Sequence, residues 1–305
     1  MTEPVAMIAV DWGTTNRRAW ALARTGRVLA ERGDGEGLLA VKARGFVRSF
    51  ADFAQPWLVD GRSLPVVMCG MVGSKLGWAE APYIDAPADL GDLARHLHPV
   101  PFDGAARIVI VPGVSCVERG VPDVMRGEEC QVLAVLADRR LREAALLLPG
   151  THSKWVKVKD GKLISFRTYM TGELYNALTS SGTLAQLMEA GADDAAFTQG
   201  LRQSGAEGPG ALTHLLFGVR TLGLFERLER ASLSSYLSGL LIGAEMMDAT
   251  AWSGAKSVIA VGSPKLLENY RRAAGFFRLG FEAHDNSRLL PPALYTIARD
   301  AGLMA

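Results

Sequence analysis

Residues 10–20 read VDWGTTNRRAW, and this stretch decides the fold that the sequence predicts. An apolar run leads into Asp11, and a loop of glycine, two threonines and asparagine follows at once over residues 13–16. A carboxylate at the end of an apolar strand needs a partner, because a half-buried charge without one is costly. The pattern indicates a cation, a substrate hydroxyl, or a phosphate bridged through a metal. The alternative is an ordinary tight turn with a structural aspartate.

The same pattern recurs near the middle of the chain. Residues 8–32 and 145–168 each contain an apolar strand, a loop of the form G-T-x-[NS]-[RK], a second strand, a glycine turn and a third strand. The match is approximate, since the two loops stand at slightly different distances from their glycine turns. A repeat at half the chain length predicts two halves built from one three-stranded unit.

Composition and charge limit the class of protein. The 305 residues are enough for two domains of roughly 150 each. A hydrophobic fraction of 49% is typical of a globular protein with a full core. The net charge of +1 gives no basic field, which disfavours nucleic acid as a partner.

The cysteines and the N-terminus predict a cytoplasmic protein. Cys69, Cys116 and Cys130 form no CxxC pair, which indicates free thiols in a reducing compartment. The first residues, MTEPVAMIAVDW, are acidic where a signal peptide would be basic. No apolar run approaches the roughly 18 residues of a membrane span, so we expect no membrane partner. The sequence leaves open whether two chains form a homodimer.

Two Gly-Thr loops from duplicated halves are suited to binding phosphate. Backbone N–H groups in such loops, with threonine and serine hydroxyls, supply many donors for phosphate oxygens. Asp11 is then a partner of a Mg²⁺ ion that bridges the phosphates. The sequence contains neither a GxxxxGK[ST] P-loop nor a GxGxxG fingerprint, so nucleotide binding requires another architecture.

The order of these motifs resembles that of the sugar kinase, Hsp70 and actin superfamily. The order is an Asp-Gly-Thr-Thr hairpin, a mid-chain Gly-Thr hairpin and a late VIAVGSPKL turn. More narrowly, the sequence looks like the 2-dehydro-3-deoxygalactonokinase family over essentially the whole chain. The stretches that carry this likeness are DWGTTNRRAW, CGMVGSKLGW, DVMRGEE, LLLPGTHSKWV and FRTYMTGEL.

The resemblance implies an α/β fold of two ribonuclease-H-like (actin-like ATPase) domains flanking a nucleotide cleft. We expect the N-terminal domain over residues 1–135 and the C-terminal domain over 136–287. The last helix, residues 288–305, is expected to pack back on the N-terminal domain.

The resemblance also implies an ATP-dependent kinase that needs Mg²⁺. Its substrate would be the sugar acid 2-dehydro-3-deoxy-D-galactonate, phosphorylated on the 6-hydroxyl in galactonate and galactose catabolism. Three alternatives remain: a kinase for another sugar acid, a phosphohydrolase of the same superfamily, and a non-catalytic sugar sensor. The sensor ranks lowest, because the chain has no spare length or basic arm for a DNA-binding domain.

Residue by residue, the resemblance assigns the nucleotide contacts. Asp11 would be catalytic and would organise Mg²⁺, directly or through water. The phosphate-binding residues would be Gly13, Thr14, Thr15, Asn16 and Arg17 in the first loop, and Gly150, Thr151, His152, Ser153 and Lys154 in the second. The adenosine turn would comprise Gly262, Ser263 and Leu266.

Phosphoryl transfer to an alcohol also requires a base that accepts the hydroxyl proton. Related sugar kinases place a carboxylate at a helix start after a glycine, and MRGEECQVLA fits that position. Glu128 is the expected base, and Glu129 is the alternative one residue away. Many relatives have aspartate there, whereas phosphatases of the superfamily use glutamate. Both glutamates also simply favour a helix N-terminus, which is the structural alternative.

A 2-keto-3-deoxy sugar acid needs a cation for its carboxylate and donors for its other oxygens. Two loops that follow strands, together with an arginine beside the proposed base, supply these groups. The expected substrate residues are Gly73, Ser74, Lys75, Trp78, Arg126, Tyr169 and Glu173. Trp78 as a core residue and Arg126 as a surface arginine are the alternatives.

Overall fold

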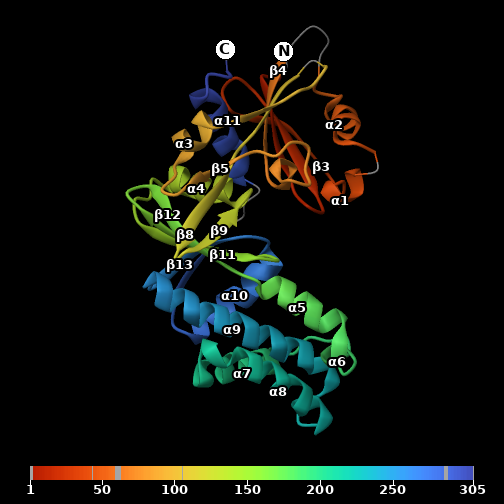
Figure 1. Ribbon diagram of the computed structural model, residues 1–305, viewed down its shortest axis with the longest axis vertical. Coiled ribbons are helices and arrows are strands. Elements are labelled where there is room, and N and C mark those ends of the chain that lie inside the picture. The colour runs from red at the N-terminus through yellow and green to blue at the C-terminus, as the bar shows by residue number, and fades with distance from the viewer. Residues whose placement is uncertain (1–2, 43, 59–62, 105, 285–287, 305) are drawn as a thin grey trace. The chain divides into compact units, whose positions relative to one another are not determined.

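The structure is a computed structural model that describes residues 3–42, 44–58, 63–104, 106–284 and 288–304. The chain divides into two compact units (Figure 1). The first comprises residues 1–143, 158–165 and 286–305, and the second comprises residues 144–157 and 166–285. Among the described residues, no helix has both the length and the apolar character that crossing a membrane requires.

A six-stranded sheet forms the centre of the first unit, in the order β3-β2-β1-β4-β7-β6. The strands β1, β4 and β7 are parallel, whereas β2, β3 and β6 run antiparallel to their neighbours. The bounds are β1 (Met7–Trp12), β2 (Arg17–Leu22), β3 (Val28–Asp34), β4 (Leu64–Cys69), β6 (His98–Val100) and β7 (Ala106–Ile110). The three strands predicted over the first thirty residues are confirmed.

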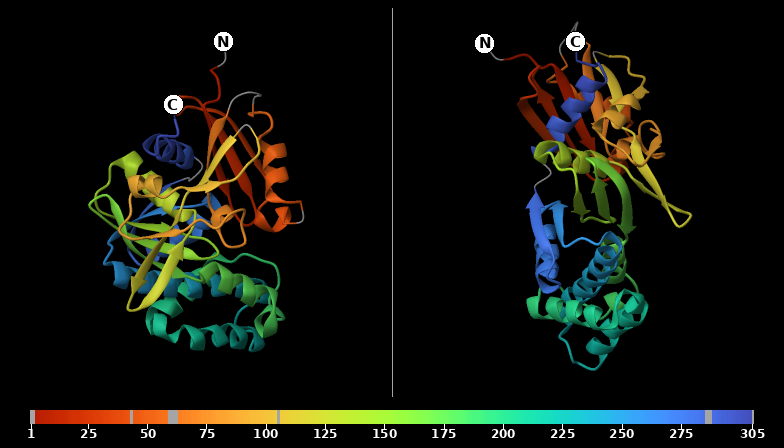
Figure 2. Two further views of the ribbon diagram at one scale, coloured as in Figure 1. Left: turned by 45° about the horizontal axis from the view of Figure 1, so that its top comes forward. Right: turned by 90° about the vertical axis from the view of Figure 1, so that its left-hand side faces the viewer.

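Helices cover both faces of this sheet. They are α1 (Leu38–Val41), α2 (Phe46–Ala54), α3 (Leu90–Arg95), α4 (Glu128–Arg139) and α11 (Leu290–Asp300), with a short 3-10 turn, η1 (Met71–Gly73). Phe50 and Phe53 of α2 pack against Ile8 and Val10 on one face. The helix α11 contacts β1, β4, α3 and α4 on the other (Figure 2, dark blue). Because side chains alternate along β1, Asp11 shares a face with Met7 and Ala9 rather than with Ile8 and Val10.

A second, smaller sheet in the first unit joins the end of β7 to the start of α4. Its order is β5-β8-β9. The bounds are β5 (Tyr83–Asp85), β8 (Gly113–Glu118) and β9 (Val121–Met125). The sequence analysis did not predict these strands.

The second unit repeats the strand order of the first. Its sheet runs β12-β11-β10-β13-β14, with β13 parallel to both β10 and β14. The bounds are β10 (Ala144–Leu148), β11 (Ser153–Lys159), β12 (Lys162–Tyr169), β13 (Ser257–Val261) and β14 (Gly280–His284). In each unit three consecutive strands lie in the order third, second, first; three further strands follow in the first unit and two in the second. The predicted internal repeat is therefore confirmed.

Helices and short turns complete the second unit. They are α5 (Thr171–Ser180), α6 (Gly182–Ala185), α7 (Asp194–Glu207), η2 (Pro209–Ala211), α8 (Leu212–Leu224), η3 (Arg230–Ser232), α9 (Leu233–Ser253) and α10 (Pro264–Phe276). The stretch GADDAAFTQGLRQSGAEGPGAL has the small and polar composition typical of loops, but α7 within it is a continuous helix. Its small residues serve close helix contact: a Cβ at Gly200 would overlap the Tyr236 carbonyl, and one at Gly239 would overlap that of Phe197.

Candidate active site

Three segments of the first unit meet at the carboxyl end of β1. Asp11 pairs in the sheet with Cys69, the last residue of β4. Gly70 has φ of +94°, and a Cβ there would lie 2.9 Å from the Trp12 carbonyl and 3.1 Å from Asp11 Oδ1. Gly127 has φ of +107°, and its Cβ would lie 3.0 Å from the Gly70 Cα. The two glycines therefore allow the start of α4 to reach the ends of β1 and β4.

The surroundings of Asp11 disfavour the charged form of its carboxylate and raise its pKa. Burial raises its pKa to about 6, the nearby Arg18 guanidinium lowers it, and the charge of Glu128 raises it again. Two carboxylates that repel each other at a strand end favour a cation between or beside them. Among the described residues, no cluster of three or more histidine, cysteine, aspartate and glutamate side chains is arranged to hold a metal ion.

The two glutamates at the start of α4 have different surroundings. Glu128 is partly exposed, and its Oε2 accepts a hydrogen bond of 3.0 Å from the Arg126 backbone N–H. Glu129 is fully buried, with Oε2 accepting from the Gly127 N–H at 2.6 Å and Oε1 3.5 Å from Cys130 Sγ. Burial raises the pKa of Glu129 to about 8, with a further increase from the charge of Glu128. Glu129 therefore holds a proton at neutral pH and does not face an open surface.

The first Gly-Thr loop presents its donors to solvent. Thr14, Thr15 and Asn16 are exposed, and the turn closes through the Gly13 N–H to the Asn16 carbonyl at 2.9 Å. Its carbonyls are tied to the start of α1, since N–H groups of residues 37–39 donate to the carbonyls of residues 13–15. The loop is therefore held from behind while its hydroxyls and the Asn16 side chain stay accessible.

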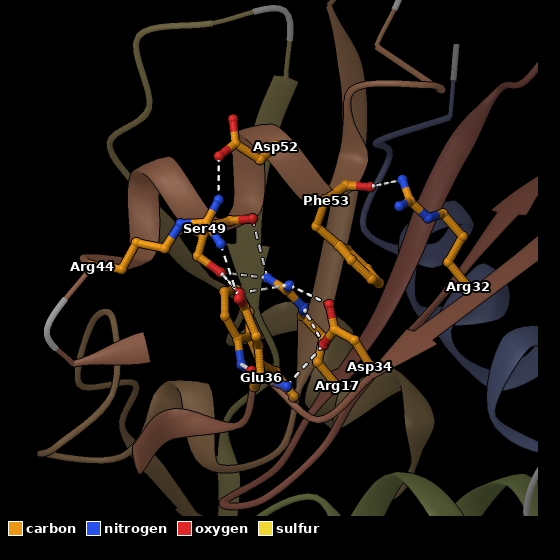
Figure 3. A network of polar contacts seen from close by, with 9 residues as sticks. Arg17, Arg32, Asp34, Glu36, Arg44, Ser49, Asp52 and Phe53 are labelled. Carbon is orange, nitrogen blue, oxygen red and sulfur yellow. Dashed lines mark hydrogen bonds and ion pairs between the residues drawn. The ribbon is translucent and has the colours of Figure 1, made fainter. Parts of the chain in front are cut away.

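Arg17 is a structural residue and not a phosphate ligand, which corrects the expectation from the sequence. Its exposure is 2%, and its five N–H donors are all engaged (Figure 3). Two hydrogen bonds go to the Asp34 carboxylate, one goes to Glu36, and two go to the carbonyl and hydroxyl of Ser49. No donor remains for a phosphate oxygen.

Aromatic rings enclose the same guanidinium. The Arg17 Cζ lies 4.6 Å from the Trp12 ring centroid and 3.9 Å from that of Phe53. The Trp12 Nε1–H donates to the Glu36 carbonyl at 2.9 Å. Arg17 thus secures the segment that holds the first loop, which is an indirect contribution to the site.

The second Gly-Thr loop is exposed only in its first part. Gly150 and Thr151 line a pocket of the second unit, and His152 is exposed and hydrogen-bonded to Glu173. Ser153 and Lys154 are buried: the serine hydroxyl bonds the Tyr270 hydroxyl at 2.8 Å, and Lys154 Nζ donates to Thr168 at 2.7 Å. The side chains of Ser153 and Lys154, which were expected to bind phosphate, are thus buried and hydrogen-bonded within the protein.

The first turn of α5 braces this loop. The Glu173 N–H donates to the Thr151 carbonyl at 2.9 Å. A Cβ at Gly172 would overlap the Gly150 carbonyl, so only glycine permits this approach. Glu173 was expected to contact the sugar acid. In the structure it is hydrogen-bonded to His152 of the second Gly-Thr loop.

The pocket beside this loop has a volume of about 960 Å³. Of the expected adenosine residues, Leu266 lines it, whereas Gly262 and Ser263 form the turn that leads into α10 and do not. The sequence analysis missed polar lining residues from three helices, namely Asn176, Ser234, Ser235, Ser238 and Asn269. The sequence does contain one signal for these residues: the serines of SLSSYLS interrupt an otherwise apolar helix.

The expected sugar-acid residues of the first unit separate into core and polar groups. Trp78 packs among Trp12, Phe46 and Phe50, with ring centroids 5.7–6.3 Å apart, and lies partly buried against the core. Lys75 is exposed, and Gly73 is buried against the Arg126 guanidinium.

Arg126 is a buried arginine rather than a surface one. Nη2 donates to the Ala81 carbonyl at 2.8 Å, and the guanidinium lies 4.2 Å from the Tyr83 ring centroid. Nη1 is buried without a partner, and so is the hydroxyl oxygen of Ser74 on the adjoining loop. Buried polar atoms without partners are rare, and a water, an ion or a ligand oxygen commonly satisfies them.

Tyr169 lies elsewhere, in the second unit. Its hydroxyl donates to Asp248 Oδ2 at 2.6 Å, and it lines a separate pocket of about 340 Å³. Burial and the Asp248 carboxylate raise its pKa.

Comparison with known proteins identifies the family. The model of the family described as 2-keto-3-deoxy-galactonokinase matches residues 11–297. The chain is 37% identical over 304 residues to the probable 2-dehydro-3-deoxygalactonokinase of Rhizobium meliloti (strain 1021), covering 98% of each chain. It is 36% identical over 271 residues to the 2-dehydro-3-deoxygalactonokinase of Escherichia coli (strain K12), covering 87% of this chain and 88% of the relative.

Solved structures agree. A Sinorhizobium meliloti protein assigned to the same activity superposes with a TM-score of 0.89 at 37% identity, covering 96% of this chain and 98% of that one. Component A of the (R)-2-hydroxyglutaryl-CoA dehydratase of Acidaminococcus fermentans shares the fold, with a TM-score of 0.53 at 11% identity. The predicted α/β fold of the actin-like ATPase and sugar-kinase class is confirmed. The chain belongs to the 2-keto-3-deoxy-galactonokinase family, a family of ATP-using kinases.

Proposed function

We propose that this chain transfers the γ-phosphoryl group of ATP to the 6-hydroxyl of 2-dehydro-3-deoxy-D-galactonate. The observation that carries the proposal is the meeting of Asp11 and Glu128 at the end of β1, next to a loop of exposed donors. Phosphoryl transfer requires mainly positioning and charge stabilisation, with one carboxylate for the acceptor's proton. Membership of the family supports the identity of the sugar acid.

We assign the nucleotide contacts to the exposed residues of the two Gly-Thr loops. The loop at residues 13–16 offers accessible backbone and hydroxyl donors for phosphate oxygens, and residues 150–152 do the same in the second unit. The pocket of about 960 Å³ beside the second loop is large enough for a nucleoside. Its serine and asparagine side chains supply polar groups for the base and ribose.

The donors present fit Mg²⁺. Carboxylate oxygens are preferred ligands of this ion, which usually binds one or two of them together with the phosphates of its nucleotide. Asp11 would hold it, directly or through water, and the ion would offset the burial and the Glu128 charge that raise the pKa of Asp11. When bound, it would neutralise charge on the phosphate oxygens.

Glu128 is the group we assign to the acceptor hydroxyl. It is partly exposed, close enough to Asp11 to influence its pKa, and fixed by the hydrogen bond from the Arg126 N–H. From this position it would orient the 6-hydroxyl and take its proton. Glu129 is unsuited, because it is buried and already protonated at neutral pH.

Arg126 and Ser74 are assigned to the carboxylate of the sugar acid. The unpartnered Nη1 of Arg126 and the unpartnered Ser74 hydroxyl would each donate to an oxygen of the acid. Because Arg126 directly precedes the glycine before Glu128, one short segment would then position both ends of the acceptor.

A coupled ADP-release assay with Mg-ATP tests the proposal. The acceptors are 2-dehydro-3-deoxygalactonate, its gluconate epimer, glycerol, and buffer alone. We expect release that depends strongly on the galactonate acid. Equal release without acceptor would instead indicate a phosphohydrolase, and faster release with the epimer would indicate a kinase for another sugar acid.

A further inference from the structure

A buried carboxylate in the second unit has no part in the chemistry described so far. Glu245 lies in α9 with an exposure of 3%. Burying a charge is costly unless hydrogen bonds compensate for it. Burial raises its pKa, and hydrogen bonds from surrounding side chains lower it.

The compensating donors come from different elements. The Trp155 Nε1–H donates to Oε1 at 2.8 Å, and the Tyr270 hydroxyl donates to Oε2 at 2.7 Å. The nearby Thr171 and Ser153 side chains also lower the pKa of the carboxylate. Because Tyr270 gives its only proton to Glu245, its contact with Ser153 has the serine as donor. One carboxylate thus gathers side chains from β11, α5 and α10.

These partners surround the pocket assigned to the nucleotide. Ser153 directly follows the exposed part of the second Gly-Thr loop, and Thr171 starts the helix turn that braces that loop. Thr171 and Tyr270 line the pocket of about 960 Å³. Glu245 itself is absent from that lining, so its effect on a bound nucleotide would be indirect.

We propose that Glu245 is a positioning residue for the nucleotide: its buried carboxylate fixes the second Gly-Thr loop, the start of α5 and the Tyr270 wall of the pocket. The proposal rests on the proposed function, in which this pocket binds ATP. Loss of the carboxylate would loosen several walls of one pocket together while leaving the Asp11 and Glu128 region of the first unit unchanged.

The test is a titration of the full-length protein with ADP, followed by steady-state kinetics. Glu245→Gln keeps the shape but replaces one acceptor oxygen with an NH₂ group that opposes a donor. We expect ADP affinity to fall and the KM for ATP to rise, each by about tenfold, as for loss of one charge-assisted hydrogen bond. The KM for the sugar acid should stay unchanged.

Two further variants make the test specific. Tyr270→Phe removes one donor and should give an effect in the same direction, and the double variant should lose less than the product of the single effects. Leu240→Val loosens the same helix in its apolar contact with α7 and α8, and it should lower the melting temperature without changing ADP affinity.

The outcomes separate the two proposals. ADP binding by the wild type with unchanged affinity in both Glu245→Gln and Tyr270→Phe would overturn the positioning role alone. The same would follow if all variants lost affinity for ADP and sugar acid in proportion to their loss of melting temperature. Failure of the wild type to bind ADP would overturn the proposed function as well.

Discussion

Glu128 and Glu129 are adjacent residues with opposite surroundings, and this difference predicts opposite effects of the same substitution. Glu128→Gln removes the group that accepts the hydroxyl proton, so we expect kcat to fall by about 100- to 10,000-fold. The KM for ATP should change little. Steady-state kinetics with Mg-ATP and the sugar acid measure both constants.

Glu129→Gln is the matched control. Glutamine resembles the protonated acid, and its carbonyl can still accept from the Gly127 N–H. Most of the activity should therefore remain. A larger loss of kcat in Glu129→Gln than in Glu128→Gln would show that the base has been misassigned.

Glu129 also predicts how stability depends on pH. Its folded pKa of about 8 lies above the ordinary 4.5, so the folded state holds a proton that the unfolded state releases across that window. Stability is therefore lost as pH rises from 4.5 towards 8. Between pH 5 and 8, Glu129→Gln without ligand should gain about 1–3 kcal/mol in unfolding free energy relative to wild type. Urea titrations at several pH values measure this difference, and parallel curves would contradict it.

Arg17 and Arg18 form a second matched pair. Removing a buried arginine that pairs with carboxylates costs about 3–5 kcal/mol, because it leaves buried charge unpaired. We expect Arg17→Met to lose that much unfolding free energy. Arg18 is half-exposed in a 3.4 Å pair with Glu31, and Arg18→Met should change stability by about 0.5 kcal/mol or less. Equal stability of the two variants would refute the structural role of Arg17.

At the residue scale, the sequence indicated which segments form the candidate site better than it indicated the role of each side chain in them. The motifs led to Asp11 and Glu128, which lie close enough for the Glu128 charge to raise the pKa of Asp11. They did not distinguish exposed from buried members of one motif. Arg17, Ser153 and Lys154 begin strands, and a residue's side in a strand depends on register with neighbours that the motif does not contain. The packing of Trp78 was unreadable for a similar reason, since its aromatic partners are distant in sequence.

At the element scale, the contact between α5 and the second Gly-Thr loop governs nucleotide binding in our account. Gly172→Ala would drive a methyl group into the Gly150 carbonyl, so the loop must shift. We expect the KM for ATP to rise at least tenfold, or about 1.4 kcal/mol. Gly218→Ala in α8 is the control, since a Cβ there has open space and alanine favours a helix. An unchanged KM in Gly172→Ala would mean that the loop does not depend on this contact.

The sequence predicted the apolar strands of the repeat and missed the smaller elements. Strands β1 to β3 follow a clear apolar pattern and were expected. The strands β8 and β9 alternate weakly and expose Val117, Val121 and Val124. The small residues of α7 resemble a loop in composition, but they are required by its close approach to α9.

At the scale of the whole molecule, the sequence predicted the duplicated strand order. It did not predict every segment that belongs to each unit. The tip of the β11–β12 hairpin, residues 158–165, belongs to the first unit. Lys162 there pairs with Asp89 at 2.9 Å, and Leu163 forms a β-bridge with Ala88. These contacts join positions about seventy residues apart in the sequence, so no local sequence pattern predicts them.

The most direct test of the central claim is the identity of the phosphorylated product. The purified protein would be incubated with Mg-ATP and 2-dehydro-3-deoxy-D-galactonate and followed by ³¹P NMR with proton coupling. The account predicts a new phosphomonoester signal split into a triplet by the methylene protons on C6. A rise in inorganic phosphate without any phosphomonoester, or a phosphomonoester on a secondary carbon, would contradict it.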